Sequence, residues 1–276
     1  MGYIAPPHND LRAYYADEYR KTHSNAVGKV LSPRENFDLM RPLLDRREEF
    51  FRKYIPEGAK VLEIGCSSGY FLDRIRDDYA VFGNEWNPDD AAFVRDELGI
   101  PCSEEAFEDA YPGEEFTAIV AYQVIEHLPD PHAWITAIKK RLIGGGWIIV
   151  ETPNLDNALV SIYDIPEFKD FFFRESHITY FDQTALANTL GSHGFEAQVY
   201  LRQDYSFWNT VHWLYAREPQ PDVVVARAPI KPIPEGHPAG VILNRLFARF
   251  DREYHTALDT LRACDYLMGV GRKREI

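Results

Sequence analysis

The hydrophobic positions of the chain fall into short apolar runs separated by segments of helical periodicity. Four runs are continuously apolar and rich in β-branched residues, near residues 60–64, 79–83, 116–122 and 147–152. Strands buried on both faces of a parallel sheet have this composition, because neither face meets water. Helices are predicted between these runs, over about residues 69–77, 88–98 and 131–142.

A helical segment is predicted before the first strand. Ser32 is a suitable N-cap, Pro33 suits the first helical position, and Glu35 follows three residues after the cap. This spacing is that of a capping box, which satisfies two backbone N–H groups at a helix start. We expect Pro42 to kink or split this helix before it ends near Tyr54.

The alternation of strand and helix predicts a doubly wound α/β sheet, whose ligand lies at the carboxyl ends of the strands. Asp130 is the predicted N-cap of the third helix, and Gly144 to Gly146 are predicted to end it. Later in the chain we expect a helix over 182–195 that ends before Gly194, then a strand at 196–202 and a last strand at 265–273.

Four regions are predicted from these elements. Residues 1–57 form an N-terminal arm and helical cap, 58–204 the core, 205–263 an insertion, and 264–276 the final core strand and tail. Six prolines between 219 and 238 predict a linker or extended flap without regular structure. The helical periodicity that follows belongs to the same insertion, which we expect to form either a substrate lid or a dimer surface.

Charge and composition exclude several classes of protein. The formal net charge is −13 and the apolar share is 45%, which favours a globular protein and argues against a nucleic-acid partner. Cys66, Cys102 and Cys264 are far apart and match no metal-binding pattern, so we expect reduced thiols. We expect no signal peptide and no membrane span, and therefore a cytoplasmic protein.

The first strand runs into a loop of small residues in the stretch VLEIGCSSGYFL. A dinucleotide loop, G-x-G-x-x-G, would place glycines at 65, 67 and 70, and only Gly65 fits. An S-adenosylmethionine (SAM) loop, an acid followed by alternating glycines, is matched by Glu63, Gly65 and Gly69, with Ser67 at the middle position. Taken by itself, the loop also fits a tight turn without a ligand.

A carboxylate at the end of the second strand favours a nucleoside ligand. Glu85 follows Gly65 by 20 residues, where a carboxylate accepts hydrogen bonds from both ribose hydroxyls in dinucleotide folds. Trp86 comes next and is placed to pack on the adenine face.

With these residues in view, the chain resembles the class I SAM-dependent methyltransferases, especially the group acting on sugars and other small molecules. Four motifs carry the resemblance in the group's order, namely LEIGCSSGYFL, YQVIEHLPDP, GGGWIIVETPN and HITYFDQTAL, and the match covers about residues 58–200. The resemblance implies a Rossmann-like, seven-stranded, mostly parallel sheet with helices on both faces. It also implies SAM as cofactor.

The resemblance assigns the methionine end of SAM to the first loop. Gly65, Ser67 and Gly69 would line the methionine portion, Glu63 would help hold its amino group, and Glu85 would bind the ribose. Serine in place of the middle glycine adds a side chain and is expected to keep φ negative unless it is strained. Serine still permits close approach to a ligand and offers a hydroxyl.

Later motifs supply the rest of the implied cofactor site. Glu105, Ala106 and Phe107 would lie beside the adenine, with Glu105 accepting from its exocyclic amine, and Gln123 would flank the methionine end. Tyrosines of the N-terminal arm often close over the cofactor in this group, and the candidates here are Tyr14, Tyr15 and Tyr19. Thr117, where the group commonly has an acid, is taken as a variation of the fold.

Two histidines are expected near the methyl group. O-methylation of a weakly nucleophilic hydroxyl calls for a general base, and histidine suits that role near neutral pH. His177 is the first candidate and His127 the second, although a histidine bonded to backbone remains the alternative for each. Tyr180 and Arg174 are the candidate substrate contacts, with a solvated surface charge as the alternative for Arg174.

The predicted function is SAM-dependent methyl transfer to a small molecule, at a hydroxyl of a sugar, a nucleotide-linked sugar or a related metabolite. C- or N-methylation of a similar substrate, an inactive SAM-binding scaffold and a nicotinamide oxidoreductase are the alternatives. Asp89 and Asp90 are interpreted as acids at a helix start, so no metal is predicted. A homodimer is considered, since the insertion offers a surface for one.

Overall fold

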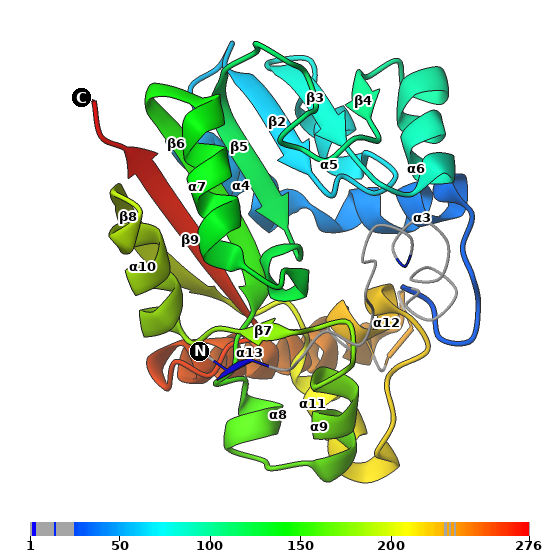
Figure 1. Ribbon diagram of the computed structural model, residues 1–276. Helices are drawn as coiled ribbons and strands as arrows, with labels where there is room; N and C mark the ends of the chain where they lie inside the picture. Colours follow the sequence, from blue (N-terminus) through cyan, green and yellow to red (C-terminus); the bar gives the residue numbers. More distant parts are fainter. Residues whose placement is uncertain are drawn as a thin grey trace.

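The computed structural model describes residues 2–3, 14, 25–228, 231, 233–234 and 236–275. At its centre lies a seven-stranded sheet with the order β4-β3-β2-β5-β6-β9-β8 (Figure 1). Its strands, in chain order, are β2 (Lys60–Ile64), β3 (Ala80–Asn84), β4 (Cys102–Ser103), β5 (Phe116–Tyr122), β6 (Leu142–Pro153), β8 (Phe195–Arg202) and β9 (Tyr266–Lys273). A separate antiparallel pair joins β1 (Gly2–Tyr3) to β7 (Thr179–Tyr180).

The direction of winding reverses between β2 and β5. The chain first moves outward from β2 through β3 to β4, and then returns to place β5 on the other side of β2. These strands and β6 are parallel, whereas β9 is antiparallel to both β6 and β8. The predicted doubly wound, mostly parallel sheet is therefore confirmed, and its ligand edge lies at the carboxyl ends of β2 and β5.

Helices cover both faces of the sheet (Figure 1). The longer ones of the core are α3 (Pro33–Met40), α4 (Asp45–Tyr54), α5 (Tyr70–Ile75), α6 (Pro88–Ala92), α7 (Pro131–Arg141) and α10 (Gln183–Ser192). Short connecting turns are η2 (Arg41–Leu43), the π-helix η3 (Phe93–Glu97) and η4 (Ile125–His127). The remaining helices are α8 (Ala158–Ser161), α9 (Pro166–Phe172), α11 (Phe207–Ala216), α12 (Val223–Arg227) and α13 (Pro238–Thr260).

Two hydrophobic clusters lie on opposite faces of the sheet and explain its uninterrupted apolar strands. Successive residues Val61 and Leu62 of β2 are both fully buried, and each belongs to a different cluster. Phe51 of α4 packs in the first cluster and Ile135 of α7 in the second. Neither face of β2 meets solvent, so apolar residues predominate on both faces, and Glu63 is a buried exception.

The N-terminal helices follow their sequence signals. The Ser32 hydroxyl accepts the backbone N–H of Glu35, and the Glu35 carboxylate accepts the backbone N–H of Ser32, so the predicted capping box is present. The helix then splits at η2, which contains Pro42, and α4 ends at Tyr54 as predicted. The break follows from the proline ring, which removes one helical hydrogen bond and crowds the preceding turn.

The glycines after α7 lie in a strand, which corrects their predicted role. The helix ends at Arg141 and β6 begins at Leu142, well before the predicted start at 147. Leu142 pairs with Phe116, and the register shifts before Ala118 pairs with Trp147. Gly144 to Gly146 therefore supply the extra length of an irregular strand, which glycine tolerates because it lacks a Cβ atom.

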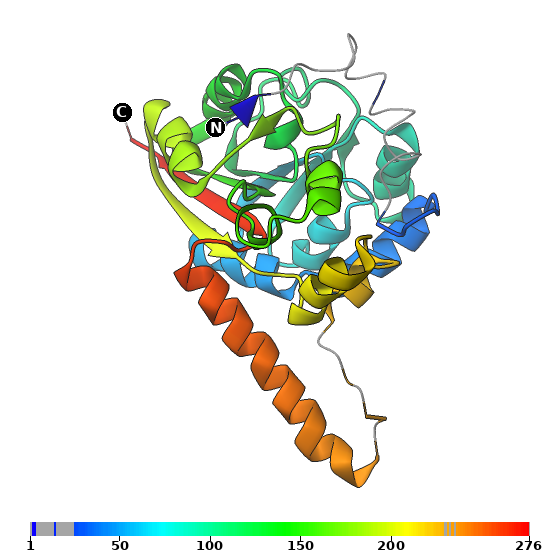
Figure 2. The same cartoon turned by 90° about the horizontal axis from the view of Figure 1, so that it is seen from below.

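The second half of the chain contains helices that its irregular pattern conceals. Neither α8 nor α9 was predicted, and α12 corrects the expectation that residues 219–238 lack regular structure. The Asp222 side chain caps α12 by accepting the Val225 N–H at 2.8 Å. Helix α13 projects away from the body of the molecule (Figure 2), and among the described residues no helix is both long and apolar enough to cross a membrane.

The segment between β8 and β9 leaves and rejoins the sheet at one place. Arg202 at the end of β8 pairs with Tyr266 at the start of β9. One carboxylate oxygen of Asp265 accepts the backbone N–H groups of Asp204 at 2.9 Å and Tyr205 at 2.8 Å. The two ends of this segment are thus fastened to each other by side-chain and backbone hydrogen bonds.

Candidate active site

The loop between β2 and α5 requires glycine at two positions. Gly65 and Gly69 have φ values of +69° and +71°. A Cβ atom at Gly65 would lie 2.7 Å from Cγ2 of Val124, and one at Gly69 would lie 2.8 Å from Cγ2 of Val94. Both backbone conformation and space therefore exclude larger residues, as expected for a loop that brings its backbone close to a ligand.

Ser67 adopts the left-handed conformation with φ +49°, so the expectation of a negative φ is wrong. Its hydroxyl accepts a hydrogen bond from the amide of Asn36 at 3.2 Å, and the same amide bonds the Ser68 hydroxyl at 2.9 Å. Asn36 lies in α3 and accepts in turn from Asn25 at 2.7 Å. The cap helix thus holds the loop in a conformation that serine alone disfavours.

Glu85 ties the end of β3 to the same loop. One of its carboxylate oxygens accepts the Ser67 N–H at 2.8 Å, and the other accepts the Asn87 N–H at 2.8 Å. These bonds fix the orientation of the carboxylate at the switch point of the sheet. The geometry suits an acceptor for ribose hydroxyls, because each carboxylate oxygen has further lone pairs.

Glu63 lies beneath the loop and is almost fully buried, with an exposed fraction of 2%. Burial raises the pKa of its carboxyl group well above the usual range, Arg47 acts in the opposite direction, and the charges of Glu85 and Glu151 add to the increase. One carboxylate oxygen, Oε2, has no hydrogen-bond partner among the described residues. An ammonium group is a suitable hydrogen-bond donor to a buried carboxylate oxygen of this kind.

A buried charge network centred on Glu151 surrounds Gln123, the residue predicted to flank the methionine end of SAM, and the sequence did not point to this network. The Glu151 carboxylate lies 2.8 Å from the guanidinium of Arg47 and 2.5 Å from that of Arg202. Burial disfavours its ionisation, but Arg202 and Arg47 outweigh burial and lower its pKa to about 2. Gln123 has a φ of +59°, and its side-chain amide donates to the same carboxylate at 3.0 Å. The network therefore fixes the orientation of Gln123, which was predicted to flank the methionine.

The two predicted histidines meet, and a third side chain joins them. The rings of His127 and His177 have centroids 4.9 Å apart, and the carboxylate of Glu126 lies beside them. All three side chains are buried. Nδ1 of His127 lies 2.6 Å from the carbonyl oxygen of Ser176, which is the backbone contact considered as the alternative to a catalytic role. The other ring nitrogen, Nε2, lies 3.9 Å from a Glu126 oxygen.

The sequence did not identify Glu126, whose burial is its distinguishing property. It is 1% exposed, and neither of its oxygens has a hydrogen-bond partner within the described part of the chain. Burial raises its pKa to about 8. Val124 precedes Glu126 by two residues, and its side chain lies against Gly65. The cluster of Glu126 and the two histidines therefore follows directly after a contact with the β2–α5 loop.

An aromatic wall continues from the histidines. The hydroxyl of Tyr180 donates to the carbonyl oxygen of Phe172 at 3.1 Å, and its ring centroid lies 6.0 Å from that of His177. The guanidinium of Arg174 lies 4.9 Å from the ring centroid of Phe171. The backbone N–H of His177 donates to the carbonyl oxygen of Arg174 at 3.0 Å. Both predicted substrate residues therefore lie near His177, and their contact with a substrate stays a prediction.

The predicted adenine residues surround the ends of β3 and β4. Phe107 is buried and packs edge to face against Trp134, while Glu105 is exposed. The backbone carbonyl of Glu105 accepts from the side chain of Asn84 at 2.8 Å. The adenine contacts of Phe107 and Glu105 stay predictions. The same holds for the adjoining residues Trp86 and Ala106.

The N-terminal tyrosines are only partly described. Tyr14 is buried, whereas Tyr15 and Tyr19 lie outside the residues that the structure describes. Their predicted closure over the cofactor stays a prediction.

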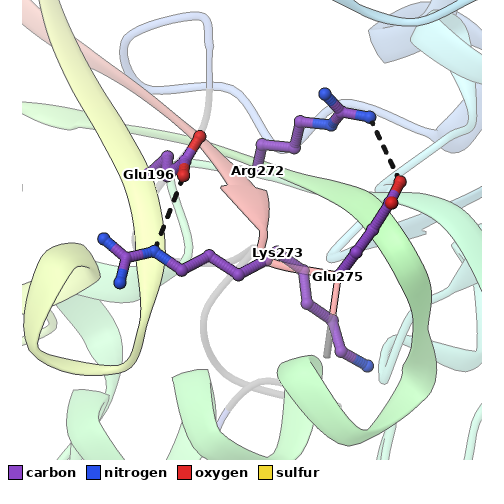
Figure 3. A pocket seen from close by; sticks show the side chains of 5 residues that line it. Glu196, Arg272, Lys273 and Glu275 are labelled. Carbon is purple, nitrogen blue, oxygen red and sulfur yellow. Dashed lines mark ion pairs between the residues drawn. The ribbon is translucent and has the colours of Figure 1, made fainter.

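A shallow depression of about 320 Å³ lies at the opposite edge of the sheet (Figure 3). Its charges compensate one another, since Arg274 lies 3.6 Å from Glu196 and Arg272 lies 3.7 Å from Glu275. Arg272 pairs with Trp147 near the amino ends of the parallel strands. This depression is therefore remote from the ligand edge.

Comparison with known proteins agrees with the geometry. A family described as "Methyltransferase domain" matches residues 34–199. The ubiquinone biosynthesis O-methyltransferase of Cereibacter sphaeroides is 30% identical over 105 residues, which are 36% of this chain and 42% of that protein. The chain thus matches less than half the length of this curated relative.

Solved structures share the fold at low sequence identity. A SAM-dependent methyltransferase from Archaeoglobus fulgidus is similar with a TM-score of 0.54 and 16% identity, covering 87% of this chain and 96% of that one. Phosphoethanolamine N-methyltransferase 2 of Haemonchus contortus, in complex with SAM, has a TM-score of 0.58 and 11% identity, covering 97% and 61%. The chain belongs to the methyltransferase domain family, with the fold of the class I SAM-dependent methyltransferases and SAM as the cofactor of the family.

Proposed function

We propose that the protein transfers the methyl group of SAM to a hydroxyl of a small molecule, in the class of sugars, nucleotide-linked sugars or related metabolites. The observation that carries this proposal is the pair His127 and His177, buried together beyond the carboxyl end of β5. Aromatic residues continue the same surface, and aromatic faces favour both sugar rings and a sulfonium cation. The O-methyltransferase relative agrees with a hydroxyl acceptor.

In this proposal the methionine end of SAM would lie on the β2–α5 loop. Glu63 would hold the amino group and Glu85 the ribose hydroxyls. Gln123 would flank the methionine, because it is fastened to Glu151 next to Arg47. The adenine would lie near Trp86 and Phe107.

Methyl transfer from a sulfonium is an in-line displacement. The acceptor oxygen must lie about 3–3.5 Å from the methyl carbon, with water excluded. In the protein without a metal ion, we assign His177 as the general base that accepts the proton of the acceptor hydroxyl, with His127 as the second candidate. Such a base contributes roughly 10²- to 10⁴-fold to the rate.

Two variants separate binding from transfer. His177→Ala is expected to lower turnover by about 10²-fold or more while SAM affinity, measured by calorimetry, stays within about twofold. Glu85→Ala is expected to weaken SAM binding first, because it removes the ribose acceptor and the Ser67 N–H partner. His193→Ala is the matched control, since this partly exposed histidine pairs with His132 on another surface.

The assay uses methyl release from SAM with a panel of sugars and nucleotide-linked sugars. Methylation of carbon or nitrogen acceptors alone would replace the hydroxyl proposal. Tight SAM binding without turnover on any acceptor would favour the scaffold. Unchanged turnover in His177→Ala would remove this residue from the transfer step.

A further inference from the structure

We propose that Glu126, His127 and His177 form a binding site for one divalent transition-metal ion. Each side chain offers one ligand atom, and these three atoms lie within 4.8 Å of one another. Two imidazole nitrogens and one carboxylate oxygen favour zinc-like ions over magnesium or calcium, which prefer oxygen ligands. The proposal rests on the proposed function only for the role of the ion.

The carboxylate of Glu126 is the strongest sign of a missing ligand. It is 1% exposed, and among the described residues neither oxygen accepts a hydrogen bond. A buried carboxylate normally has several hydrogen-bond donors or a cation, because desolvation is costly. Within the described residues its ion-pair contact is with His127, whose Nε2 lies 3.9 Å from Oε1.

His127 is oriented as metal-binding histidines commonly are. Its Nδ1 lies 2.6 Å from the carbonyl oxygen of Ser176. An N–H at Nδ1 donates to this carbonyl, which leaves the lone pair on Nε2, the nitrogen on the side of Glu126. A backbone carbonyl in this position fixes the tautomer and the ring orientation of metal ligands.

The distances are close to those of an assembled site. Metal bonds of about 2.0–2.2 Å in tetrahedral geometry place ligand atoms about 3.3 Å apart. The His127–Glu126 separation of 3.9 Å therefore has to shorten by about 0.6 Å. The other separations in the cluster lie within 4.8 Å and would have to shorten by as much as about 1.5 Å, through rotation of the side chains. Backbone hydrogen bonds already hold the two segments together, since the Ile178 N–H donates to the carbonyl oxygen of Glu126 at 2.8 Å.

Three protein ligands leave a coordination position for the acceptor oxygen. An ion there lowers the pKa of the acceptor hydroxyl, whose proton leaves to water. The oxygen then forms a bond to the methyl carbon of SAM, and the carbon–sulfur bond breaks with its electron pair on sulfur. In this state His177 is a metal ligand, and the ion replaces it in activating the hydroxyl.

Cobalt(II) is a suitable probe, because its visible absorption reports nitrogen and oxygen coordination. The full-length protein is treated with EDTA, desalted and titrated with CoCl₂, with calorimetry as the second readout. One ion per chain is expected for the native protein. Glu126→Gln and His177→Ala are expected to weaken binding by about tenfold or more, while each retains SAM affinity as a test of folding.

His193→Ala is the matched control and should bind cobalt as the native protein does. His193 packs against His132, and neither histidine belongs to the cluster. Absence of cobalt binding by the native protein would overturn the site. Equal binding by Glu126→Gln and His177→Ala, or loss in His193→Ala, would do the same. If either cluster variant fails to fold, the other still decides the outcome.

Activity assays separate this inference from the proposed function. Hydroxyl methylation that is lost in EDTA and restored by zinc or cobalt supports the ion's role and transfer to a hydroxyl, and it would contradict His177 as the base. Equal hydroxyl methylation with and without EDTA would overturn the role of the ion and leave the proposed function intact. Cobalt binding that depends on Glu126, without methylation of any hydroxyl, supports the site and contradicts the proposed function.

Discussion

Glu151 shows how one buried carboxylate connects several segments around the candidate site. It lies in β6 and bonds Arg47 of α4, Arg202 of β8 and the side chain of Gln123 after β5. Arg47 also lies over the ring of Tyr122, at 4.2 Å. Four segments distant in sequence therefore share one buried charge.

Neutralising Glu151 is expected to destabilise the protein strongly at neutral pH. Glu151→Gln removes the counter-ion of the buried Arg47 and one of the two counter-ions of Arg202, which keeps Asp204. Breaking a buried ion pair typically costs about 3–5 kcal/mol. The free energy of unfolding from urea titrations measures this loss. The control is Glu35→Gln, an exposed member of an ion pair with Lys29, which should change stability little because glutamine still completes the capping box.

The effect of Glu151 should depend on pH in a definite direction. Its pKa is about 2 in the folded protein against an ordinary value of 4.5, so the unfolded chain binds a proton first as pH falls. The stabilisation is present above pH 4.5 and is lost between about pH 4.5 and 2, by roughly 3 kcal/mol in all. A native-minus-variant difference that stayed constant over this range would contradict the assignment.

Single residues could be predicted where a strand end marks them. Glu85 and His127 each follow a buried strand closely, and His177 lies in an aromatic stretch, so sequence position alone suggested ligand contact. Glu151 and Arg47 were missed because they are 104 residues apart, and no local pattern connects them. Glu126 was passed over beside His127, since only the tertiary structure reveals that no described residue donates a hydrogen bond to its carboxylate.

At the scale of elements, the β2–α5 loop combines backbone strain with close packing. Gly65, Ser67 and Gly69 all have positive φ values, and Val124 and Val94 occupy the space above the two glycines. Helix α3 stabilises the middle residue through Asn36. The loop therefore depends on the N-terminal cap as well as on its own sequence.

Gly65→Ala and Gly99→Ala separate crowding from backbone strain. Their φ values are +69° and +66°, but a Cβ atom meets Val124 at 2.7 Å in the first and nothing within 4 Å in the second. Gly99→Ala should cost about 1–2 kcal/mol from strain alone. Gly65→Ala should cost about 1–3 kcal/mol more from overpacking and should also weaken SAM binding.

Thermal unfolding and SAM calorimetry measure the two variants. Equal destabilisation would show that Val124 moves aside freely, and undiminished SAM affinity in Gly65→Ala would remove the loop from the cofactor site.

Elements with a continuous apolar run or a clear cap were predictable, as β2, β5 and the α3 capping box show. Helix α12 was hidden because the proline density around it suggested an extended chain, while one Asp222 cap suffices for a single turn. The start of β6 was misplaced because three glycines suggest a turn. The strand pairing of Leu142 with Phe116 is a tertiary interaction, and it outweighs the local preference of glycine for turns.

At the scale of the whole molecule, the proposed cofactor site joins distant parts of the fold. The proposed SAM site draws on β2, β3, β5 and the cap helices, so ligand binding should stabilise the chain as a unit. SAM at about 100 times its Kd adds about 2.7 kcal/mol to the free energy of unfolding. For a chain of this size that corresponds to a Tm increase of roughly 5 °C.

Calorimetric or fluorescence melting curves test this increase, with NAD as the comparison ligand. The demethylated product should also raise the Tm, because it retains the adenosine and amino-acid groups. A rise with NAD and none with SAM would restore the oxidoreductase alternative.

The fastening of Asp265 to Asp204 and Tyr205 has a consequence for the segment between β8 and β9. Because the chain departs from β8 and returns to β9 through one point, the length between them is decoupled from the pairing of the two strands. Loop-closure cost grows only slowly with length. A shorter segment without α13 should therefore keep the pairing of Arg202 with Tyr266, while it loses the packing of Leu258 against Leu201 and Ala158.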